Sequence, residues 1–256
     1  MKYTDLIFDL YGTLVDIHTE ENSVVWEKTA MYFGFYGAQY SADELEASFR
    51  KALAKREAKA GQSYEYFPDI PFEQVMEELF QEKGISENTK ALGRNAAQLF
   101  RITSIEYIKL YPYVMEALAY LRKKGFRLWL LSNAQHIFTA YELELLGLND
   151  QFDGIYLSSD FGYRKPDVRF FRALMEEYCL EPSKCLMIGN DRDTDIAGAK
   201  ACGMDTLYMH TNLTPSEQEE AKPEMYPHGG SKKGHYEFEG YVWRLLSELV
   251  NNLSRR

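Results

Sequence analysis

The sequence has little of three things that mark particular classes of protein: cysteine, excess positive charge and long apolar runs. Three cysteines occur in 256 residues, and their odd number and spacing fit neither a metal site nor a disulfide framework. Lys and Arg total 29 against 39 Asp and Glu, so the net charge of −10 disfavours nucleic-acid and anionic-membrane partners. No apolar run approaches the length of a membrane span, and the N-terminal residues lack a secretory signal pattern. We therefore expect a cytoplasmic protein whose thiols are buried and reduced.

The second half of the chain alternates short apolar strands with helices. The hydrophobic fraction of the whole chain is 45%, which is enough for a sizeable core. Such alternation predicts an α/β fold with a doubly wound parallel sheet, resembling a Rossmann fold. The strands are expected at residues 3–10, 127–131, 154–157, 185–188 and 205–209. The helices that accompany them are expected at residues 114–124, 135–146, 167–178 and 194–201.

Residues 17–105 show only helical patterns and predict an inserted all-helical domain, with residues 1–16 and 106–256 forming the core domain. Its helices are expected at about 20–34, 42–61, 72–83 and 88–103, the second opened by a Ser41–Glu44 capping box and the third by Pro71 as first helical residue. A group of large aromatic residues should form the core of this insert: Trp26, Tyr32, Phe33, Phe35, Tyr36 and Tyr40. Residues 211–240 predict a long irregular segment, and a final helix is expected over 241–253.

Polar residues follow each expected strand of the sheet. In an open parallel sheet, ligands bind beyond the carboxyl ends of the strands, so these side chains should meet at one edge. Together they offer a carboxylate that can act as a nucleophile, hydroxyl groups, a lysine and an acidic cluster, which suits an anion bound beside a cation. The candidate residues are Asp9, Tyr11, Thr13, Ser132, Asn133, Lys165, Asn190, Asp191 and Asp195.

Four segments in order resemble the motifs of the haloacid dehalogenase superfamily of hydrolases. They are Phe-Asp-Leu-Tyr-Gly-Thr-Leu-Val-Asp at residues 8–16, Leu-Ser-Asn at 131–133, Arg-Lys-Pro-Asp at 164–167 and Ile-Gly-Asn-Asp-Arg-Asp-Thr-Asp-Ile-Ala-Gly-Ala at 188–199. Any one of these motifs is weak alone, but four in order on the expected elements are specific. The resemblance covers residues 3 to about 212. It implies that the helical insert is a cap that closes over the site and selects the substrate.

The resemblance also implies a role for each candidate residue. Asp9 is the expected nucleophile, giving an aspartyl intermediate that water hydrolyses. Thr13 and Ser132 are expected to donate hydrogen bonds to a phosphate and Lys165 to neutralise it, while Asn133 fits either a site role or a helix N-cap. Mg²⁺ is the expected cofactor, bound by Asp9, the main-chain oxygen of Tyr11 and residues of the fourth motif.

Two positions depart from the pattern of most phosphatases in this superfamily. Tyr11 stands where they have an aspartate as general acid and base, and a phenol with a pKa of about 10 is a poor base at neutral pH. Asn190 stands where the fourth motif usually has its first aspartate. The metal-binding carboxylate is then Asp191 or Asp195, or Asn190 binds through its amide oxygen; Asp193 is expected to be exposed.

Three functions follow from this pattern. The first is a Mg²⁺-dependent phosphatase, monomer or homodimer, acting on a small phosphomonoester. The second is a metal-independent 2-haloacid dehalogenase, since these enzymes also carry a tyrosine at this position and halide leaves without a proton. The third is a catalytically weak binding protein of the same fold. Without a cation, the fourth-motif aspartates repel an anionic substrate by about 1–4 kcal/mol per close pair, which favours the phosphatase.

Overall fold

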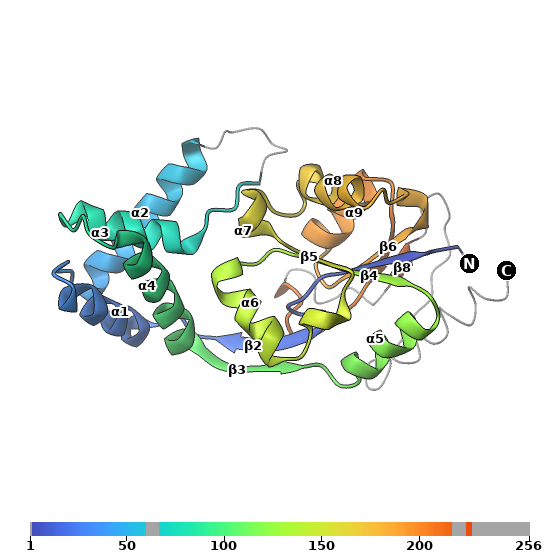
Figure 1. Cartoon of the computed structure of the whole chain (residues 1–256), viewed down its shortest axis with the longest axis horizontal. Helices are drawn as coiled ribbons and strands as arrows, with labels where there is room; N and C mark the ends of the chain where they lie inside the picture. The colour runs from blue at the N-terminus through green and yellow to red at the C-terminus, as the bar shows by residue number, and fades with distance from the viewer. Residues whose placement is uncertain (1, 60–66, 217–223, 227–256) are drawn as a thin grey trace.

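A computed structural model of the chain describes residues 2–59, 67–216 and 224–226, and its centre is a six-stranded sheet (Figure 1). The strand order is β5-β4-β1-β6-β7-β8, and the first five strands are parallel. The α/β fold is therefore confirmed, but β8 pairs antiparallel with β7 inside the segment that was expected to be irregular. A strand of three residues is too short to leave a periodic signal. The bounds are β1 Asp5–Phe8, β4 Arg127–Ser132, β5 Gly154–Leu157, β6 Cys185–Gly189, β7 Asp205–Tyr208 and β8 Glu224–Tyr226.

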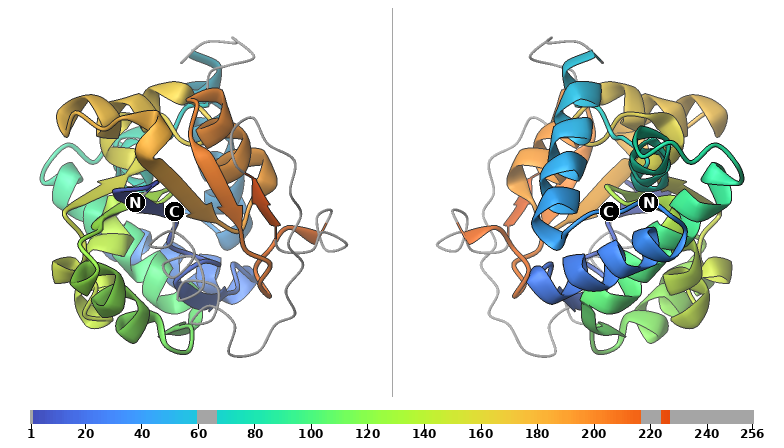
Figure 2. Two further views of the ribbon diagram at one scale, coloured as in Figure 1. Left: turned by 90° about the vertical axis from the view of Figure 1, so that its right-hand side faces the viewer. Right: turned by 90° about the vertical axis from the view of Figure 1, so that its left-hand side faces the viewer.

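Helices cover both faces of this sheet, because successive strand residues point to opposite sides. Leu6 and Phe8 of β1 pack with helices α5 and α6 on one face, whereas Ile7 packs with α8 and α9 on the other. Figures 1 and 2 show α5 and α8 on opposite sides of the sheet. The helices are α5 Val114–Lys123, α6 His136–Leu145, α8 Val168–Glu177 and α9 Ala197–Ala201, with a short α7 at Ser158–Phe161 and single turns at Asn149–Gln151, Pro182–Lys184 and Arg192–Ile196.

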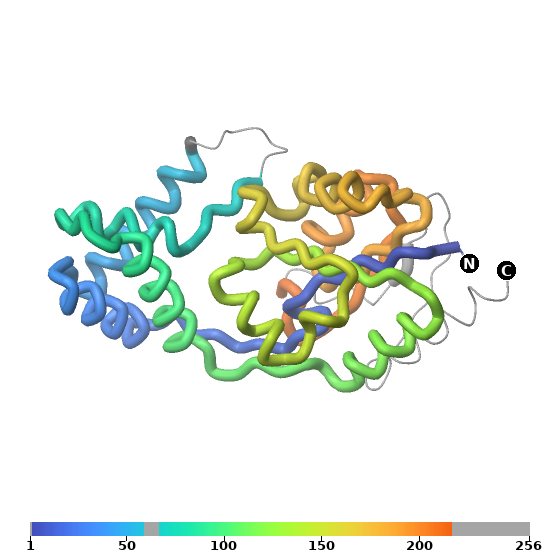
Figure 3. The backbone as a smooth tube through the Cα atoms, viewed as in Figure 1, coloured from blue at the N-terminus to red at the C-terminus, as the bar shows by residue number. Residues whose placement is uncertain are grey.

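The helical insert lies at one end of the sheet and has a hydrophobic core of its own (Figure 3). The expected capping box is confirmed, since the Glu44 amide donates to Ser41 Oγ and the Ser41 amide donates to the Glu44 carboxylate. Pro71, expected as the first helical residue, is instead the N-cap. The helices are α1 Ser23–Phe35, α2 Ala42–Lys59, α3 Phe72–Glu82 and α4 Thr89–Ser104.

Two strands that the sequence did not reveal join the insert to the sheet. β2 (Val15–Thr19) and β3 (Ile105–Leu110) pair antiparallel and carry the chain between the two groups of elements (Figure 3). Residues 17–105 are therefore not all helical. The two strands are far apart in sequence, and β3 is half exposed without a clean alternation, so local pattern could not pair them. The domain boundaries at 16/17 and 105/106 stay a prediction.

Several smaller expectations are corrected by burial. Phe35 and Tyr36 are exposed rather than part of the insert's core, whereas Trp26 and Phe33 are buried as expected. Cys179, which follows the C-cap of α8 and has φ of 52°, is also exposed rather than buried as expected. The helix expected over 194–201 is confirmed, since the helical turn at Arg192–Ile196 runs directly into α9, whereas the one expected over 241–253 lies outside the described residues. Within the described ranges, no helix combines the length and apolarity that crossing a membrane requires.

Candidate active site

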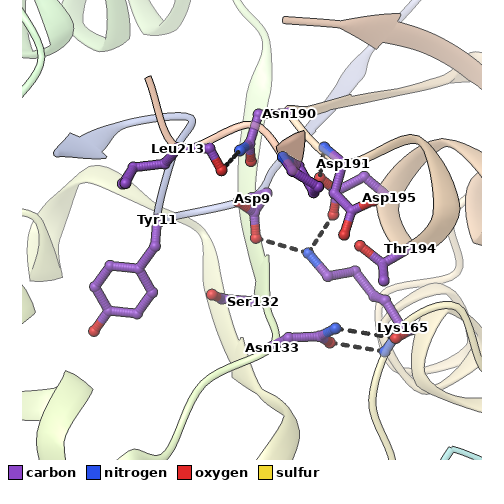
Figure 4. A pocket seen from close by; sticks show the side chains of 11 residues that line it. Asp9, Tyr11, Ser132, Asn133, Lys165, Asn190, Asp191, Thr194, Asp195 and Leu213 are labelled. Carbon is purple, nitrogen blue, oxygen red and sulfur yellow. Dashed lines mark hydrogen bonds and ion pairs between the residues drawn. The ribbon is translucent and has the colours of Figure 1, made fainter. Parts of the chain in front are cut away.

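The candidate residues gather in one cavity of about 180 Å³ beyond the carboxyl ends of β1, β4 and β6. β1 lies between β4 and β6 in the sheet, so the residues that follow these strands converge there. Figure 4 shows them around a common space. The cavity is lined by Asp9, Tyr11, Ser132, Asn133, Lys165, Asn190, Asp191, Thr194, Asp195, Leu213 and Pro215.

A buried lysine between two carboxylates is the centre of this cavity. Lys165 Nζ lies 2.7 Å from Asp9 Oδ1, 2.6 Å from Asp195 Oδ1 and 2.7 Å from the Leu131 carbonyl oxygen. Burial opposes the charged form of Lys165, but the carboxylates of Asp195 and Asp9 outweigh it and raise the pKa of the ammonium group. Burial also raises the pKa of Asp195, against the attraction of Lys165. The ammonium therefore fixes the Asp9 carboxylate at the cavity.

The turn after β1 depends on a glycine. Gly12 has φ of +84°, and a Cβ there would lie 2.2 Å from Asn190 Nδ2. This close approach places Thr13 so that its hydroxyl lies 3.2 Å from both Asp9 Oδ2 and Asn190 Oδ1. Thr13 does not line the cavity in this structure, and its hydroxyl instead contacts the nucleophile candidate directly.

Ser132 ends β4 and Asn133 follows it, and the two side chains have different roles. Ser132 is buried, and its Oγ has no hydrogen-bond partner among the described residues. An unpaired buried hydroxyl that lines a cavity is a donor ready for a bound ligand. Asn133 uses both ends of its amide on the main chain of Lys165, at 2.7 Å and 3.0 Å, and so orients that residue.

Tyr11 lines the cavity, but its hydroxyl points away from Asp9 (Figure 4). The hydroxyl lies 2.9 Å from Thr139 Oγ1 and donates a short hydrogen bond to Glu142. Burial and the charge of Glu142 raise the pKa of Tyr11, so the phenol keeps its proton. The Tyr11 side chain is thus not placed to act as a base at Asp9.

The fourth motif supplies oxygen donors beside Asp9. Asp195 is buried against Gly189, where a Cβ would lie 2.2 Å from Asp195 Oδ2. Asp191 accepts from the Asp193 amide at 2.9 Å and reaches the cavity, whereas Asp193 is exposed as expected. Asn190 accepts from Thr13 and donates to the Leu213 carbonyl oxygen at 3.2 Å.

The chemistry of these donors fits Mg²⁺, which prefers carboxylate, amide and carbonyl oxygens and keeps several waters. The carboxylates alone do not form a tight cluster, since Lys165 stands between Asp9 and Asp195. In the described part of the chain, the one group of three metal-type side chains with ligand atoms within 4.8 Å is the exposed set His18 on β2, Glu20 just after it and Glu106 on β3. Mg²⁺ at the candidate site therefore needs the Asn190 amide or the Tyr11 carbonyl oxygen as well.

A family model of haloacid dehalogenase-like hydrolases matches residues 6–203, a range that holds all four motifs. The chain belongs to this family of hydrolases. The resemblance inferred from the motifs is thereby confirmed, and all of the residues that line the cavity except Leu213 and Pro215 belong to the motifs.

This hydrolase is similar to several curated phosphatases. It is 27% identical to a phosphoglycolate phosphatase of Aquifex aeolicus over 78% of this chain and 82% of that protein. It is 30% identical to a glyceraldehyde 3-phosphate phosphatase of Methanothermobacter thermautotrophicus over 44% of this chain and 50% of that protein. Other relatives are matched over 47% to 61% of their length. A crystal structure of a phosphatase from Thermococcus onnurineus shares the fold, with a TM-score of 0.53, 20% identity and coverage of 98% of this chain and 97% of that one.

The hydrolase also has a second cavity, of about 420 Å³, that sequence reasoning did not find. It lies where the helical insert meets the core, and it shares Tyr11 and Asn133 with the first cavity. Residues from α3, α4 and α6 meet there, and no local pattern indicates which faces of these helices come together. The other lining residues are Ile17, Thr19, Glu21, Asp69, Phe72, Phe100, Arg101, Ser104, Ala134, Gln135, Phe138, Thr139 and Arg164.

Sequence reasoning also missed the ion pair that closes one side of this second cavity. Arg101 of α4 donates to both carboxylate oxygens of Glu142 of α6, at 2.6 Å and 3.1 Å, and Glu142 in turn accepts from Tyr11. The pair links the insert to the residue two positions after Asp9. Neither residue lies in a motif, so no signal in the sequence marked it.

Proposed function

We propose that this hydrolase is a Mg²⁺-dependent phosphatase that acts on a small phosphomonoester through an aspartyl-phosphate intermediate. The observation that carries the proposal is the unpaired Ser132 hydroxyl in a cavity that also holds the Asp9 carboxylate and the Lys165 ammonium. A phosphate needs a nucleophile on one side and fixed donors around its oxygens. The curated relatives named as phosphatases support the same reaction.

The protein's own residues divide the work. The Asp9 carboxylate attacks phosphorus, while the Lys165 ammonium and the Ser132 hydroxyl bind the phosphate oxygens as charge develops on them. Asn133 holds Lys165 in place through its main chain. Asp9, the Tyr11 carbonyl oxygen and one or two of Asn190, Asp191 and Asp195 would hold Mg²⁺, which would supply positive charge that offsets the phosphate dianion.

Charge distinguishes this proposal from a metal-independent 2-haloacid dehalogenase. Three carboxyl groups, those of Asp9, Asp191 and Asp195, line the cavity against one cationic side chain, that of Lys165. A substrate carboxylate would meet this excess without a compensating cation. Tyr11 is the observation that favours the dehalogenase, since the reaction needs no proton donor at that position. Tyr11 also favours the third function, a catalytically weak binding protein, because the aspartate that acts as general acid and base in most phosphatases of the superfamily is absent.

One panel tests the three functions. Phosphomonoesters and short 2-chloroacids are offered with magnesium and then with a chelator, and phosphate and chloride are measured together. We expect phosphate release that stops in chelator. Chloride release that persists in chelator would establish the dehalogenase, and ligand binding without either product would establish the binding protein.

The nucleophile is tested by Asp9→Asn, which keeps the shape of the side chain and removes its charge. We expect turnover to fall at least about 10⁴-fold with a native circular dichroism spectrum, as for other nucleophile removals. Asp193→Asn is the matched control, because Asp193 is exposed and outside the cavity lining. Comparable turnover in the two variants would exclude Asp9 as the nucleophile.

The acidic composition supports a small-molecule substrate rather than nucleic acid or a membrane, and the few cysteines support action in the cytoplasm. A monomer or homodimer stays a prediction.

A further inference from the structure

The second cavity has a lining unlike that of the site beside it. Phe72, Phe100 and Phe138 contribute aromatic rings, with Phe72 centred 5.1 Å from Phe100 and 5.4 Å from Phe138. Its volume of about 420 Å³ falls in the range of about 300–1,000 Å³ typical of pockets for ring-containing ligands. A two- or three-carbon acid would leave most of this space empty. The part of the substrate that leaves the phosphate therefore has room for a ring, and apolar surface to receive it.

Among the described residues that line the first cavity, the side chain two positions after Asp9 does not direct a proton donor at the leaving oxygen. Tyr11 occupies the position from which an acid would act, and its hydroxyl is turned to Glu142, which also accepts from Arg101. Asp69 lines only the second cavity, and it accepts from Ser158 and from Gln135, at 2.8 Å in the latter case. Among the described residues that line the first cavity, the remaining acids are Asp9 itself and the fourth-motif pair.

Without an acid, the ester oxygen must leave as a weakly basic anion. A ring hydroxyl such as that of phenol ionises with a pKa of about 10, whereas an aliphatic hydroxyl is close to water, at about 15.7. General acid catalysis is worth about 10²–10⁴-fold, and an aliphatic ester would lose that factor here.

Both observations lead to one substrate class. We propose that the enzyme acts on phosphomonoesters of a ring hydroxyl, with the ring among Phe72, Phe100 and Phe138 and the phosphate at Asp9. This inference rests on the proposed phosphatase function. The bond from an Asp9 oxygen to phosphorus forms while the bond from phosphorus to the ring oxygen breaks, and the electron pair leaves with that oxygen. Water then attacks the aspartyl phosphate, releasing inorganic phosphate and regenerating Asp9, and the proton that this frees neutralises the ring oxyanion.

The test compares phenyl phosphate with benzyl phosphate in the presence of magnesium. Both carry the same ring, but only phenyl phosphate has the acidic leaving group. We expect kcat/KM, which covers the steps up to loss of the leaving group, to be about 10²–10⁴-fold higher for phenyl phosphate. Tyr11→Asp supplies the missing acid and should narrow the ratio at least about tenfold by raising turnover of benzyl phosphate.

The ring contact is tested separately by Phe138→Ala, which should raise KM for phenyl phosphate about tenfold or more. Phe35→Ala is the matched control: that ring is 83% exposed on α1 and lines neither cavity, so kcat/KM should not change.

Each outcome has a distinct meaning. Equal kcat/KM for phenyl and benzyl phosphate, or a higher value for phosphoglycolate than for phenyl phosphate, overturns this substrate class while leaving the phosphatase intact. Absence of phosphate release from all three esters overturns the phosphatase and the substrate class together. If Phe138→Ala releases phosphate from phenyl phosphate with an unchanged KM, the substrate ring does not bind in the second cavity.

Discussion

At Ser132, the contribution of the side chain to the stability of the fold differs most clearly from its contribution to ligand binding. Its hydroxyl is buried at the carboxyl end of β4 without a partner in the described structure, so it contributes no hydrogen bond to folding. A buried polar group left unpaired costs about 1–3 kcal/mol, a cost that a bound phosphate would relieve. The position therefore favours ligand binding over stability of the free protein.

Removing this hydroxyl should affect activity more than stability. We expect Ser132→Ala to leave the free energy of unfolding unchanged or to raise it by about 1 kcal/mol, while kcat/KM falls about 10²-fold. Ser158→Ala is the control: Ser158 is equally buried, but it hydrogen-bonds Asp69 and the Ala134 amide, so we expect a loss of about 1–3 kcal/mol. Urea denaturation and steady-state kinetics give both values. A similar loss of stability in the two variants would show that Ser132 has a structural partner.

Between elements, the contact with the largest consequence joins α4 to α6. Glu142 is 5% exposed and accepts from Arg101 and Tyr11, so the helical insert is linked to the turn that follows β1. Two main-chain hydrogen bonds form a further link. The Asp69 amide donates to the Gly162 carbonyl oxygen, and the Arg164 amide donates to the Phe67 carbonyl oxygen. Together with β2 and β3, these contacts fix the insert over the site.

The Arg101 link can be measured by removing its positive charge. In Arg101→Met, Glu142 keeps its burial but loses its cation, and we expect about 3 kcal/mol of destabilisation. The exposed pair Arg50–Glu46 is the control, and Arg50→Met should cost at most about 0.5 kcal/mol. Chemical denaturation compares the two variants. Equal small losses would mean that Glu142 finds water or another donor when Arg101 is absent.

On the scale of the whole molecule, a hydrophobic core in the insert that is separate from those of the sheet raises the question of two domains. The insert's core contains Phe80, fully buried and stacked on Phe33 with ring centres 3.9 Å apart. The sheet has its own core on each face. If the predicted boundaries are right, a substitution in the core of one unit should destabilise that unit and leave the stability of the other unchanged.

Hydrogen exchange tests that division. Phe80→Ala removes about 3–5 kcal/mol of packing from the insert, so amide protection should fall in α1–α4 and persist in β1, β4 and β6. Phe170→Ala, in the core beneath α8, should do the reverse. A uniform loss of protection in both variants would show a single cooperative unit and would make the predicted domain boundaries wrong.

The sequence by itself determined the five parallel strands of the sheet and the side chains at their ends. Asp9, Ser132, Lys165 and the fourth motif could be placed together because strand ends in a parallel sheet share one edge. Alternating apolar residues, caps and turn glycines are local signals, and they need no knowledge of distant contacts.

Only the tertiary structure decided what surrounds that edge. The pairing of β2 with β3, the Arg101–Glu142 ion pair and the aromatic cavity all join segments far apart in the chain. The direction of the Tyr11 hydroxyl belongs to the same group, since Glu142 lies 131 residues away. Which faces of amphipathic helices meet depends on how the whole chain packs, and no local pattern encodes it.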